Sequence, residues 1–330
     1  MGSSPISGTR LSKTGSPEPF CAIYVIINSM KLNETAIYKT KRYFVQPEVT
    51  VEEKTTVAII GDLHISPIVS EKQCYNIYKR LVKIEPDLII LQGDLIDSPT
   101  ELFDENSVKK LKDTLKMCSR IATTVAVLGG HDFVIPTDPG VVMDVIPIWE
   151  KICEECNIEL LMDEWYETEK IRIFGLFQDA DFIIDSEGKR QDDAKIMEKK
   201  LDEFELDPEP DKINWFISHA PSINRKVIKM LKHFDVMSFG HTHGGCVPIF
   251  LDDILDKVHS NRGLVSPMKK PFPKLARGAK TLSTDTSLII NSGLIAMHYC
   301  VPKPLQKLNF IKKGEITEVV FEAEETEVDD

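Results

Sequence analysis

The sequence predicts an α/β protein in which buried strands alternate with helices. Short apolar runs end in Gly and polar residues, as in Leu88–Gln92 before Gly93-Asp94, and this pattern is typical of a buried strand with a tight turn. Segments of helical periodicity separate the first three runs, which indicates a parallel sheet with helices on its faces. Similar runs return in the second half, so we expect one domain with two packed sheets.

The first half supplies three strand–helix pairs. An edge strand before them is best placed at Tyr43–Val45. The first helix has Tyr75, Tyr78 and Leu81 at helical spacing. The predicted strands are Thr56–Ile60, Leu88–Gln92 and Thr124–Leu128, and the predicted helices are Ser70–Ile84, Glu105–Arg120 and Val142–Asn157.

The second half is less regular. The strongly charged stretch Asp181–Asp211 predicts a solvated surface helix and loop. A helix is expected at Ile223–Lys232. The predicted strands are Ile171–Gly175, Ile213–Ser218, Val236–Gly240, Ser287–Asn291, Leu308–Ile311 and Thr317–Phe321.

Composition divides the 330 residues into three parts. Residues 1–30 are rich in Ser, Gly, Pro and Thr, which predicts a leader that is disordered or foreign to the native protein. Residues 31–321 form a single domain in this interpretation, with a cap-like insertion at 247–280. Residues 322–330 are an acidic tail that we expect to fray.

Net charge and cysteine usage exclude several classes. A net charge of −12 argues against a general nucleic-acid binder. No apolar stretch approaches the roughly 20 residues that span a bilayer, and Cys21–Asn28 is too short for a signal-peptide core. Seven scattered cysteines are not a disulfide framework, and Cys153 and Cys156 are interpreted as ordinary helix residues. These features predict a cytoplasmic protein.

Aspartate and histidine side chains follow five of the predicted strands. Since ligands bind beyond the carboxyl ends of strands in open α/β sheets, these side chains predict a metal site. Their oxygen and nitrogen donors suit Mn, Fe, Zn, Ni or Co. Six donors are too many for one tetrahedral ion with an open position but fit two ions that share a carboxylate. The candidate ligands are Asp62, His64, Asp94, His219, His241 and His243.

Two ions about 3.5–4 Å apart can activate a bridging water and hold the oxygens of an in-line displacement. That chemistry favours hydrolysis of a phosphoester over acyl transfer. Any one of these residues alone is more typical of a turn or a helix cap, and Asp97 before Ser98-Pro99 is interpreted in that way. The prediction therefore depends on the whole ordered set.

From Thr56 to Phe321 this ordered set resembles the calcineurin-like metallophosphoesterases. The extended turn at 240–245, with Pro248 behind it, is similar to a bacterial subgroup that includes the YkuE-like phosphoesterases and the UDP-2,3-diacylglucosamine hydrolases. Ser292-Gly293 before a closing hydrophobic segment is similar to that subgroup too. The resemblance implies a four-layer α/β sandwich, in which helices flank two central mixed β-sheets.

The resemblance also implies roles for single residues. The first metal would be held by Asp62, His64 and His243, and the second by His219 and His241, with Asp94 bridging both. His131 would sit beside the phosphate and protonate the leaving oxygen, and Asp132 would orient it. Two divalent ions are therefore expected as cofactors, with Mn the first choice.

One position departs from the family pattern. The family has Gly-Asn-His followed by Asp or Glu, whereas this chain has Gly130 in place of the Asn. An Asn there would give its amide oxygen to the second metal, and Gly has no side chain to replace it. We expect a weakened second site and slow turnover. Gly130 also favours an alternative function, a metal-binding scaffold of the same fold that serves a partner.

The insertion carries cations that stand out against the acidic chain. One interpretation is a cap that draws a small anionic phosphate ester toward the metals, and the other is a solvated loop. A phosphomonoester, a phosphodiester and a pyrophosphate all stay open as substrates. A nuclease is least favoured, because the chain lacks a long basic groove. The candidate substrate contacts are Lys269, Lys270, Lys274 and Arg277.

Overall fold

A computed structural model describes residues 38–67, 69–136, 138, 140–183, 194–247, 249–258, 260–264, 273–294 and 314–323. These residues belong to the unit Ala36–Asp330, and the other unit, Met1–Thr35, lies outside them. The predicted leader 1–30, the predicted strand Leu308–Ile311 and the end of the acidic tail also lie outside the described residues.

The first sheet has the strand order β1-β12-β2-β3-β4-β5. Strands β2 to β5 are parallel, as the strand–helix succession predicts. The sheet is nevertheless mixed, because β12 is antiparallel to β2 and parallel to the edge strand β1. Its strands are β1 (Tyr38–Phe44), β2 (Thr55–Ile60), β3 (Leu88–Gln92), β4 (Thr123–Val127), β5 (Glu159–Leu160) and β12 (Gly314–Phe321).

The second sheet has the order β10-β11-β9-β8-β7-β6. Strands β7, β8, β9 and β11 are parallel, and antiparallel strands close both edges. The edge strands β6 and β10 were not predicted, because both are short. The strands are β6 (Glu164–Glu167), β7 (Ile171–Leu176), β8 (Ile213–Ser218), β9 (Val236–Phe239), β10 (Gly278–Thr281) and β11 (Ser287–Ile290).

The helices begin where local chemistry allows. The predicted helix at Val142–Asn157 begins only at Ile146, because Pro147 lacks an N–H and fits the first turn of a helix. The helix predicted at Ile223–Lys232 begins after Asn224, whose side chain accepts from the backbone N–H of Val227 at 3.1 Å. The α-helices are α2 (Glu71–Ile84), α3 (Glu105–Ser119), α4 (Ile146–Cys156), α5 (Ala180–Ile183), α6 (Ala194–Leu201), α7 (Arg225–Met230) and α8 (Ile249–Lys257), and the 3₁₀ helices are η1 (Pro99–Phe103), η2 (Gly130–Asp132) and η3 (His243–Cys246).

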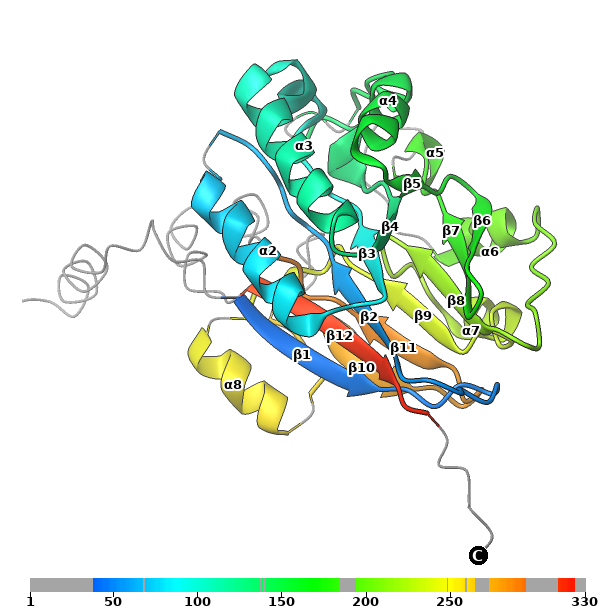
Figure 1. The fold of residues 1–330 in the computed structure, drawn as a ribbon. Coiled ribbons are helices and arrows are strands. Elements are labelled where there is room, and N and C mark those ends of the chain that lie inside the picture. Colours follow the sequence, from blue (N-terminus) through cyan, green and yellow to red (C-terminus); the bar gives the residue numbers. More distant parts are fainter. Residues whose placement is uncertain are drawn as a thin grey trace, which may run out of the picture. The chain divides into compact units, whose positions relative to one another are not determined.

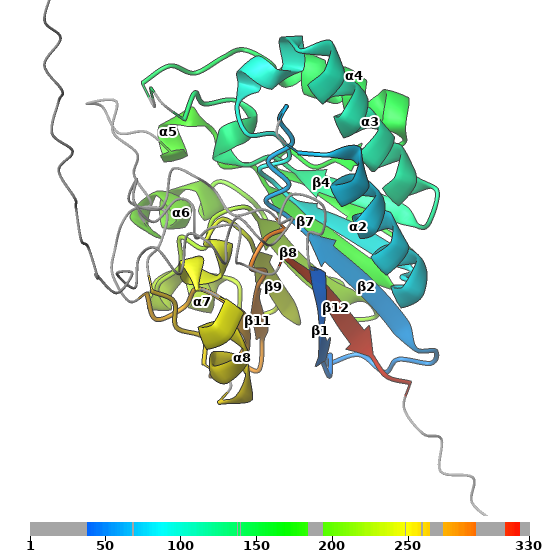
Figure 2. The ribbon, with the colours of Figure 1, turned by 90° about the vertical axis from the view of Figure 1, so that its left-hand side faces the viewer.

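Three layers of apolar side chains hold the elements together. The middle layer joins the two sheets and includes Val57 and Ile90 of the first and Trp215 and Ile217 of the second. One outer layer packs α2, α3 and α4 on the first sheet, and the other packs α6 and α7 on the second. Figure 2 shows these helices on opposite sides of the two sheets. The predicted four-layer architecture with two mixed sheets is therefore confirmed.

Strand β2 shows why the strands of these sheets form apolar runs in the sequence. All six residues of β2 are buried, since a parallel strand covered on both faces has no solvent side. The Asp and His candidates of the sequence lie beyond the strand ends, where Figure 1 shows the chain turning out of the sheet. None of the helices among the described residues is long and apolar enough to cross a membrane.

Candidate metal centre

The candidate ligands lie in turns that follow the carboxyl ends of four strands. Asp62 and His64 follow β2, Asp94 follows β3, His219 follows β8, and the pair His241 and His243 follows β9. Neighbouring turns are joined through their backbones: Asp62 N donates to Gly93 O at 2.9 Å, and Gly240 N donates to His219 O at 2.8 Å. The parallel order of the strands thus delivers all six side chains to one region.

The two sheets are joined at this region by Gln92, the last residue of β3. Its buried side-chain Nε2 donates to Ser218 O at 2.8 Å and to Ser238 O at 3.0 Å, both in the second sheet. Its Oε1 accepts from Ser238 Oγ at 3.0 Å. Sequence reasoning did not single out Gln92, although a polar residue at the end of an otherwise apolar strand was a signal for it.

The side chains gather into two groups that share one carboxylate. Ligand atoms of Asp62, His64, Asp94 and His243 lie within 4.8 Å of one another, and so do those of Asp94, His219 and His241. Asp94 is the residue that these two groups have in common.

Distances between donors fit ions better than direct hydrogen bonds. His243 Nε2 lies 3.4 Å from Asp62 Oδ1 and His64 Nε2 lies 3.9 Å from Asp94 Oδ2, longer than the roughly 2.9 Å of a good N–H···O bond. Two ligands each about 2.1 Å from an ion lie roughly 3.0–3.4 Å apart. In the second group, His219 Nε2 lies 3.1 Å from Asp94 Oδ2 and 3.3 Å from His241 Nδ1. The described residues therefore fit a pair of divalent ions.

Most of the candidate ligands have a strained backbone. The φ angle is +50° at Asp62, +42° at His64 and +50° at Asp94. It is +65° at His241 and +48° at His243. This left-handed conformation costs of order 1–3 kcal/mol per non-glycine residue and persists where the surroundings impose it, most often at functional sites. Five such residues in one centre are evidence for function that does not depend on residue type.

Two glycines let the turns approach one another. Gly93 has a φ of +81°, and a Cβ there would lie 2.7 Å from His219 Nδ1. A Cβ at Gly129 would collide with the Asp94 carboxylate. Both positions therefore exclude a side chain for reasons of space around candidate ligands.

Burial and charge explain the electrostatics. Burial disfavours charge on Asp94, yet the neighbouring His219 and His131 hold the pKa of that carboxyl well below its usual range. Burial also opposes a protonated His219, but Asp94 raises its pKa to about 9. Burial opposes charge on His64 as well, and contacts with Asp97 and Asp94 raise its pKa. The centre thus keeps a buried anion and attracts positive charge to the histidines around it.

Backbone carbonyls fix the tautomers of two histidines. His219 Nδ1 lies 2.7 Å from Gln92 O, and His131 Nδ1 lies 2.7 Å from Asp97 O. A carbonyl only accepts, so each Nδ1 carries the proton and leaves the Nε2 of a neutral ring as the acceptor. For His219, the freed atom is the Nε2 beside Asp94.

Asp132 supports His131 through the turn. Its carboxylate accepts from the N–H of Leu95 at 2.8 Å, Ile96 at 3.1 Å and Gly129 at 2.7 Å. Burial and the charge of Asp94 raise the pKa of Asp132 to about 7. These contacts tie the turn that carries His131 to the turn that carries Asp94, so Asp132 can orient His131 by fixing its backbone, while the ring nitrogen Nδ1 faces Asp97 O.

Asp97 was interpreted from sequence as a turn residue and belongs to the centre as well. Its carboxylate faces His64, its carbonyl faces His131, and ligand atoms of the three residues lie within 4.8 Å of one another. Ser98, its neighbour, is the residue that caps η1. The signal in the sequence was the spacing Gly-Asp-x-x-Asp, which keeps both aspartates in one turn.

The departure from the family pattern lies inside this centre. Gly130 is buried in η2, and its neighbour His131 donates its backbone N–H to Asp94 Oδ1 at 2.8 Å. Gly130 is not among the described glycines with positive φ. Its backbone therefore suits a residue with a side chain, although no side chain is present there to reach the second group.

The candidate substrate contacts are more scattered. Lys269 and Lys270 lie outside the described residues, and Lys274 is exposed. Arg277 is buried and pairs with Asp256 of α8. This placement is that of a buried ion-pair residue, whereas the sequence suggested Arg277 as a substrate contact.

The chain is similar in sequence to known proteins. An uncharacterized metallophosphoesterase of Aquifex aeolicus (strain VF5) is 24% identical over 230 residues, covering 68% of this chain and 76% of the relative. An uncharacterized metallophosphoesterase of Campylobacter jejuni is 23% identical over 196 residues, which are 59% of this chain and 46% of that protein. The chain thus spans about half the length of the second relative.

The chain also resembles solved structures. A dimetal phosphatase from Danio rerio superposes with a TM-score of 0.39 and 12% identity, covering 75% of this chain and 89% of that chain. A purple acid phosphatase from yellow lupin seeds gives a TM-score of 0.41 and 13% identity, with 75% of this chain and 45% of that chain covered.

The family model described as "Calcineurin-like phosphoesterase" matches residues 55–245, more than half of the 330 residues. The match runs from β2 through the turn that carries His241 and His243, and so includes every candidate ligand. The chain belongs to the calcineurin-like phosphoesterase family.

Proposed function

We propose that this chain is a phosphoester hydrolase with two divalent ions, one in each group around Asp94. The observation that carries the proposal is the pair of ligand groups that share this single buried carboxylate. When bound, the two ions supply positive charge that draws in a phosphate and favours attack on it by water. Manganese is the first choice, and Fe, Zn, Ni and Co have the same donor preferences.

The residues of the chain divide the remaining work. Asp62, His64 and His243 hold one ion, His219 and His241 the other. His131 keeps its proton on Nδ1 through Asp97 O, so its Nε2 is the atom that, once protonated, gives a proton to the leaving oxygen. Lys274 is the described candidate for an electrostatic contact with the substrate.

The sequence supports a subgroup of the family and a location in the cell. The turn at 240–245 supports the YkuE-like and UDP-2,3-diacylglucosamine hydrolase-like subgroup, and the scattered cysteines support a cytoplasmic location. The substrate is a small phosphomonoester, phosphodiester or pyrophosphate. Gly130 favours the second candidate, a scaffold that binds metal without turnover.

Hydrolysis of 4-nitrophenyl phosphate and of bis(4-nitrophenyl) phosphate, with added manganese, tests the proposal. We expect turnover that a chelator abolishes and Asp62→Asn removes, while Asp202→Asn, which changes an exposed carboxylate directly after α6, leaves it intact. Turnover that survives both chelator and Asp62→Asn contradicts the proposal. Metal binding without turnover for any divalent ion supports the scaffold.

A further inference from the structure

A buried charge interrupts the face of β12 that lies between the two sheets. Val319 and Phe321 on this face belong to the apolar middle layer. Since side chains alternate along a strand, Glu315 and Thr317 lie on the same face. Glu315 is nevertheless 0% exposed. The chain therefore buries a carboxylate on the face that otherwise builds its core.

Cations of the edge strand β1 compensate the charge of Glu315. Lys41 Nζ lies 3.2 Å and Lys39 Nζ lies 3.9 Å from Glu315 Oε2. Both lysines also pair with Asp256 of α8, Lys41 at 2.7 Å and Lys39 at 3.1 Å. Burial disfavours charge on Glu315, yet the two lysines hold the pKa of its carboxyl below the usual value. Glu315 is therefore a carboxylate at neutral pH.

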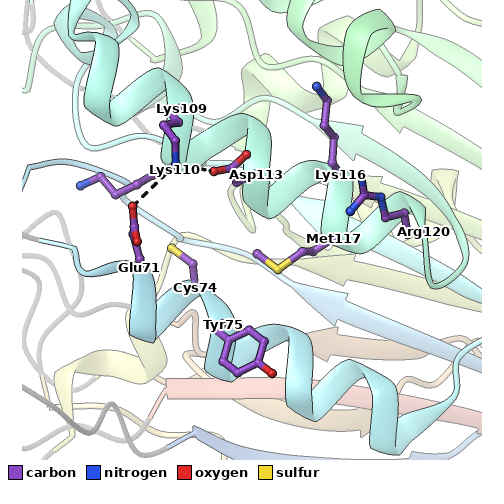
Figure 3. A pocket seen from close by; sticks show the side chains of 9 residues that line it. All are labelled: Glu71, Cys74, Tyr75, Lys109, Lys110, Asp113, Lys116, Met117 and Arg120. Carbon is purple, nitrogen blue, oxygen red and sulfur yellow. Dashed lines mark hydrogen bonds and ion pairs between the residues drawn. The ribbon is translucent and has the colours of Figure 1, made fainter.

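This buried cluster differs from the ion pairs at the surface. Lys109 and Asp113, which line the pocket between α2 and α3, pair at 2.9 Å with side chains that are 64% and 56% exposed (Figure 3). An exposed pair of this kind costs little and contributes little. Burial of a pair removes both charges from water, and their attraction often only offsets that cost. Stability alone therefore does not explain the carboxylate of Glu315.

Glu315 holds the loop 291–294, which follows β11. Its carboxylate Oε2 accepts from Ser292 Oγ at 2.9 Å, and its backbone N–H donates to Gly293 O at 3.0 Å. One residue thus fixes two consecutive residues of the loop. The sequence marked Ser292-Gly293 by its resemblance to a subgroup and assigned no role to the pair.

The loop 291–294 lies directly against Asp62. Gly293 has a φ of +72°, and a Cβ at that position would lie 2.6 Å from Asp62 Cβ and 2.7 Å from Asp62 Oδ2. Leu294 donates its N–H to Gly61 O at 3.0 Å. A shift of this loop therefore moves the surface that supports the Asp62 side chain. Asp62 is a member of the four-donor group, which consists of Asp62, His64, Asp94 and His243.

We propose that Glu315 is a positioning residue, which holds Ser292-Gly293 against Asp62 and so sets the Asp62 carboxylate for the ion of the four-donor group. The lysines of β1 keep Glu315 charged in its buried place. Asp62 belongs to the four-donor group alone, so the effect falls on one of the two ions. This role rests on the proposed function, because it requires an ion in that group.

Isothermal titration of the full chain with manganese, after dialysis against a chelator, measures the affinity of each group. Asp62→Asn identifies the binding step of the four-donor group. We expect Glu315→Ala to lower the affinity of that group about tenfold, as for a lost outer contact, and to change the other step less than about twofold. Glu315→Gln, which keeps an acceptor oxygen for Ser292 but not the charge, should recover most of the loss.

Glu318 offers a matched control on the same two strands. It is 3% exposed, and its carboxylate pairs with Arg42 of β1 at 2.9 Å. Because Glu315 and Glu318 are three residues apart on β12, their side chains lie on opposite faces of the sheet. We expect Glu318→Ala to change either affinity less than about twofold, although it also breaks an ion pair between β1 and β12. Circular dichroism of the metal-free protein checks that each variant folds.

Ser292→Ala tests the same link while both charges of the cluster stay in place. It removes the hydroxyl that donates to Glu315, and should lower the affinity of the four-donor group by up to about tenfold. This variant decides the matter if Glu315→Ala does not fold.

Three results overturn the positioning role: unchanged manganese affinity in Glu315→Ala and Ser292→Ala, an equal loss in Glu318→Ala, or an equal fall in both groups. Normal binding and turnover of the unaltered chain beside such results overturn this role alone. An unaltered chain that binds no ion in the four-donor group overturns the proposed function and this role together.

Discussion

The two groups around Asp94 differ in how many donors they have and how deeply those donors lie. Asp62, His64 and His243 join Asp94 in a group of four buried residues, whereas only His219 and the half-buried His241 join it in the other. Three side-chain donors and partial exposure give an ion fewer contacts and more competition from water. We therefore propose that one carboxylate serves a tight metal site and a weak one.

The largest expected effect comes from removing the shared residue. Asp94→Ala takes a donor from both groups and leaves His219 without the carboxylate 3.1 Å away. We expect both metal affinities to fall by more than about 100-fold, since even outer contacts of a ligand are worth about 10- to 100-fold, and turnover to fall to background. Metal content by mass spectrometry after dialysis measures the change. Loss of a single ion would show that Asp94 does not bridge.

The next largest effect separates catalysis from metal binding. His131 lies beside both groups, but its Nδ1 bonds to Asp97 O and it shares no ligand group with Asp62 or His219. We expect His131→Ala to retain two ions and to lower turnover about 10²- to 10⁴-fold, the usual range for a lost general acid. Loss of an ion in this variant would show that His131 is a metal ligand, and the separation of His131 from the two ligand groups would then be wrong.

A third variant tests whether the weak group can be completed. Gly130→Asn adds an amide next to His131, whose backbone N–H bonds to the shared Asp94, at a backbone position without positive φ. We expect the affinity of the second ion to rise about 10- to 100-fold while that of the first stays constant. Isothermal titration with manganese resolves the two steps. Equal stoichiometry and affinity before and after would mean that another donor already completes the group.

The same comparison shows what the sequence could reveal. Strand ends followed by Gly and Asp or His are local patterns, so the strands that carry Asp94 and His219 were predicted with their observed bounds. The short edge strands β6 and β10 have no such signal, because four residues are too few to show a period. The start of α4 was predicted four residues too early, because the sequence did not show that Pro147 lies in the first turn of the helix.

Contacts between distant segments could not be predicted from the sequence. Gln92 bonds to Ser218 and Ser238, more than 120 residues away, and no pattern along one strand indicates a partner in another sheet. Arg277 likewise lies in a cation-rich stretch that suggested a substrate contact, but folding brings it to Asp256. Residue type and spacing thus predicted the donors, whereas the supports of those donors depend on the fold.

Asp97 is such a support, and the smallest effect tests it. Its carboxylate lies 3.4 Å from His64 Nδ1, on the side of the ring away from Asp94, where an acceptor orients a ligating histidine and raises its basicity. We expect Asp97→Ala to lower the affinity of the four-donor group for its ion about tenfold and to leave the affinity of the other group unchanged. Asp97→Asn, which keeps an acceptor oxygen, should recover part of that loss. Because the contact to His131 uses the backbone carbonyl of residue 97, both variants retain it, and the turnover of protein saturated with manganese should change little. If Asp97→Ala weakened ion binding only in the group of His219 and His241, Asp97 would not be a support of the four-donor group.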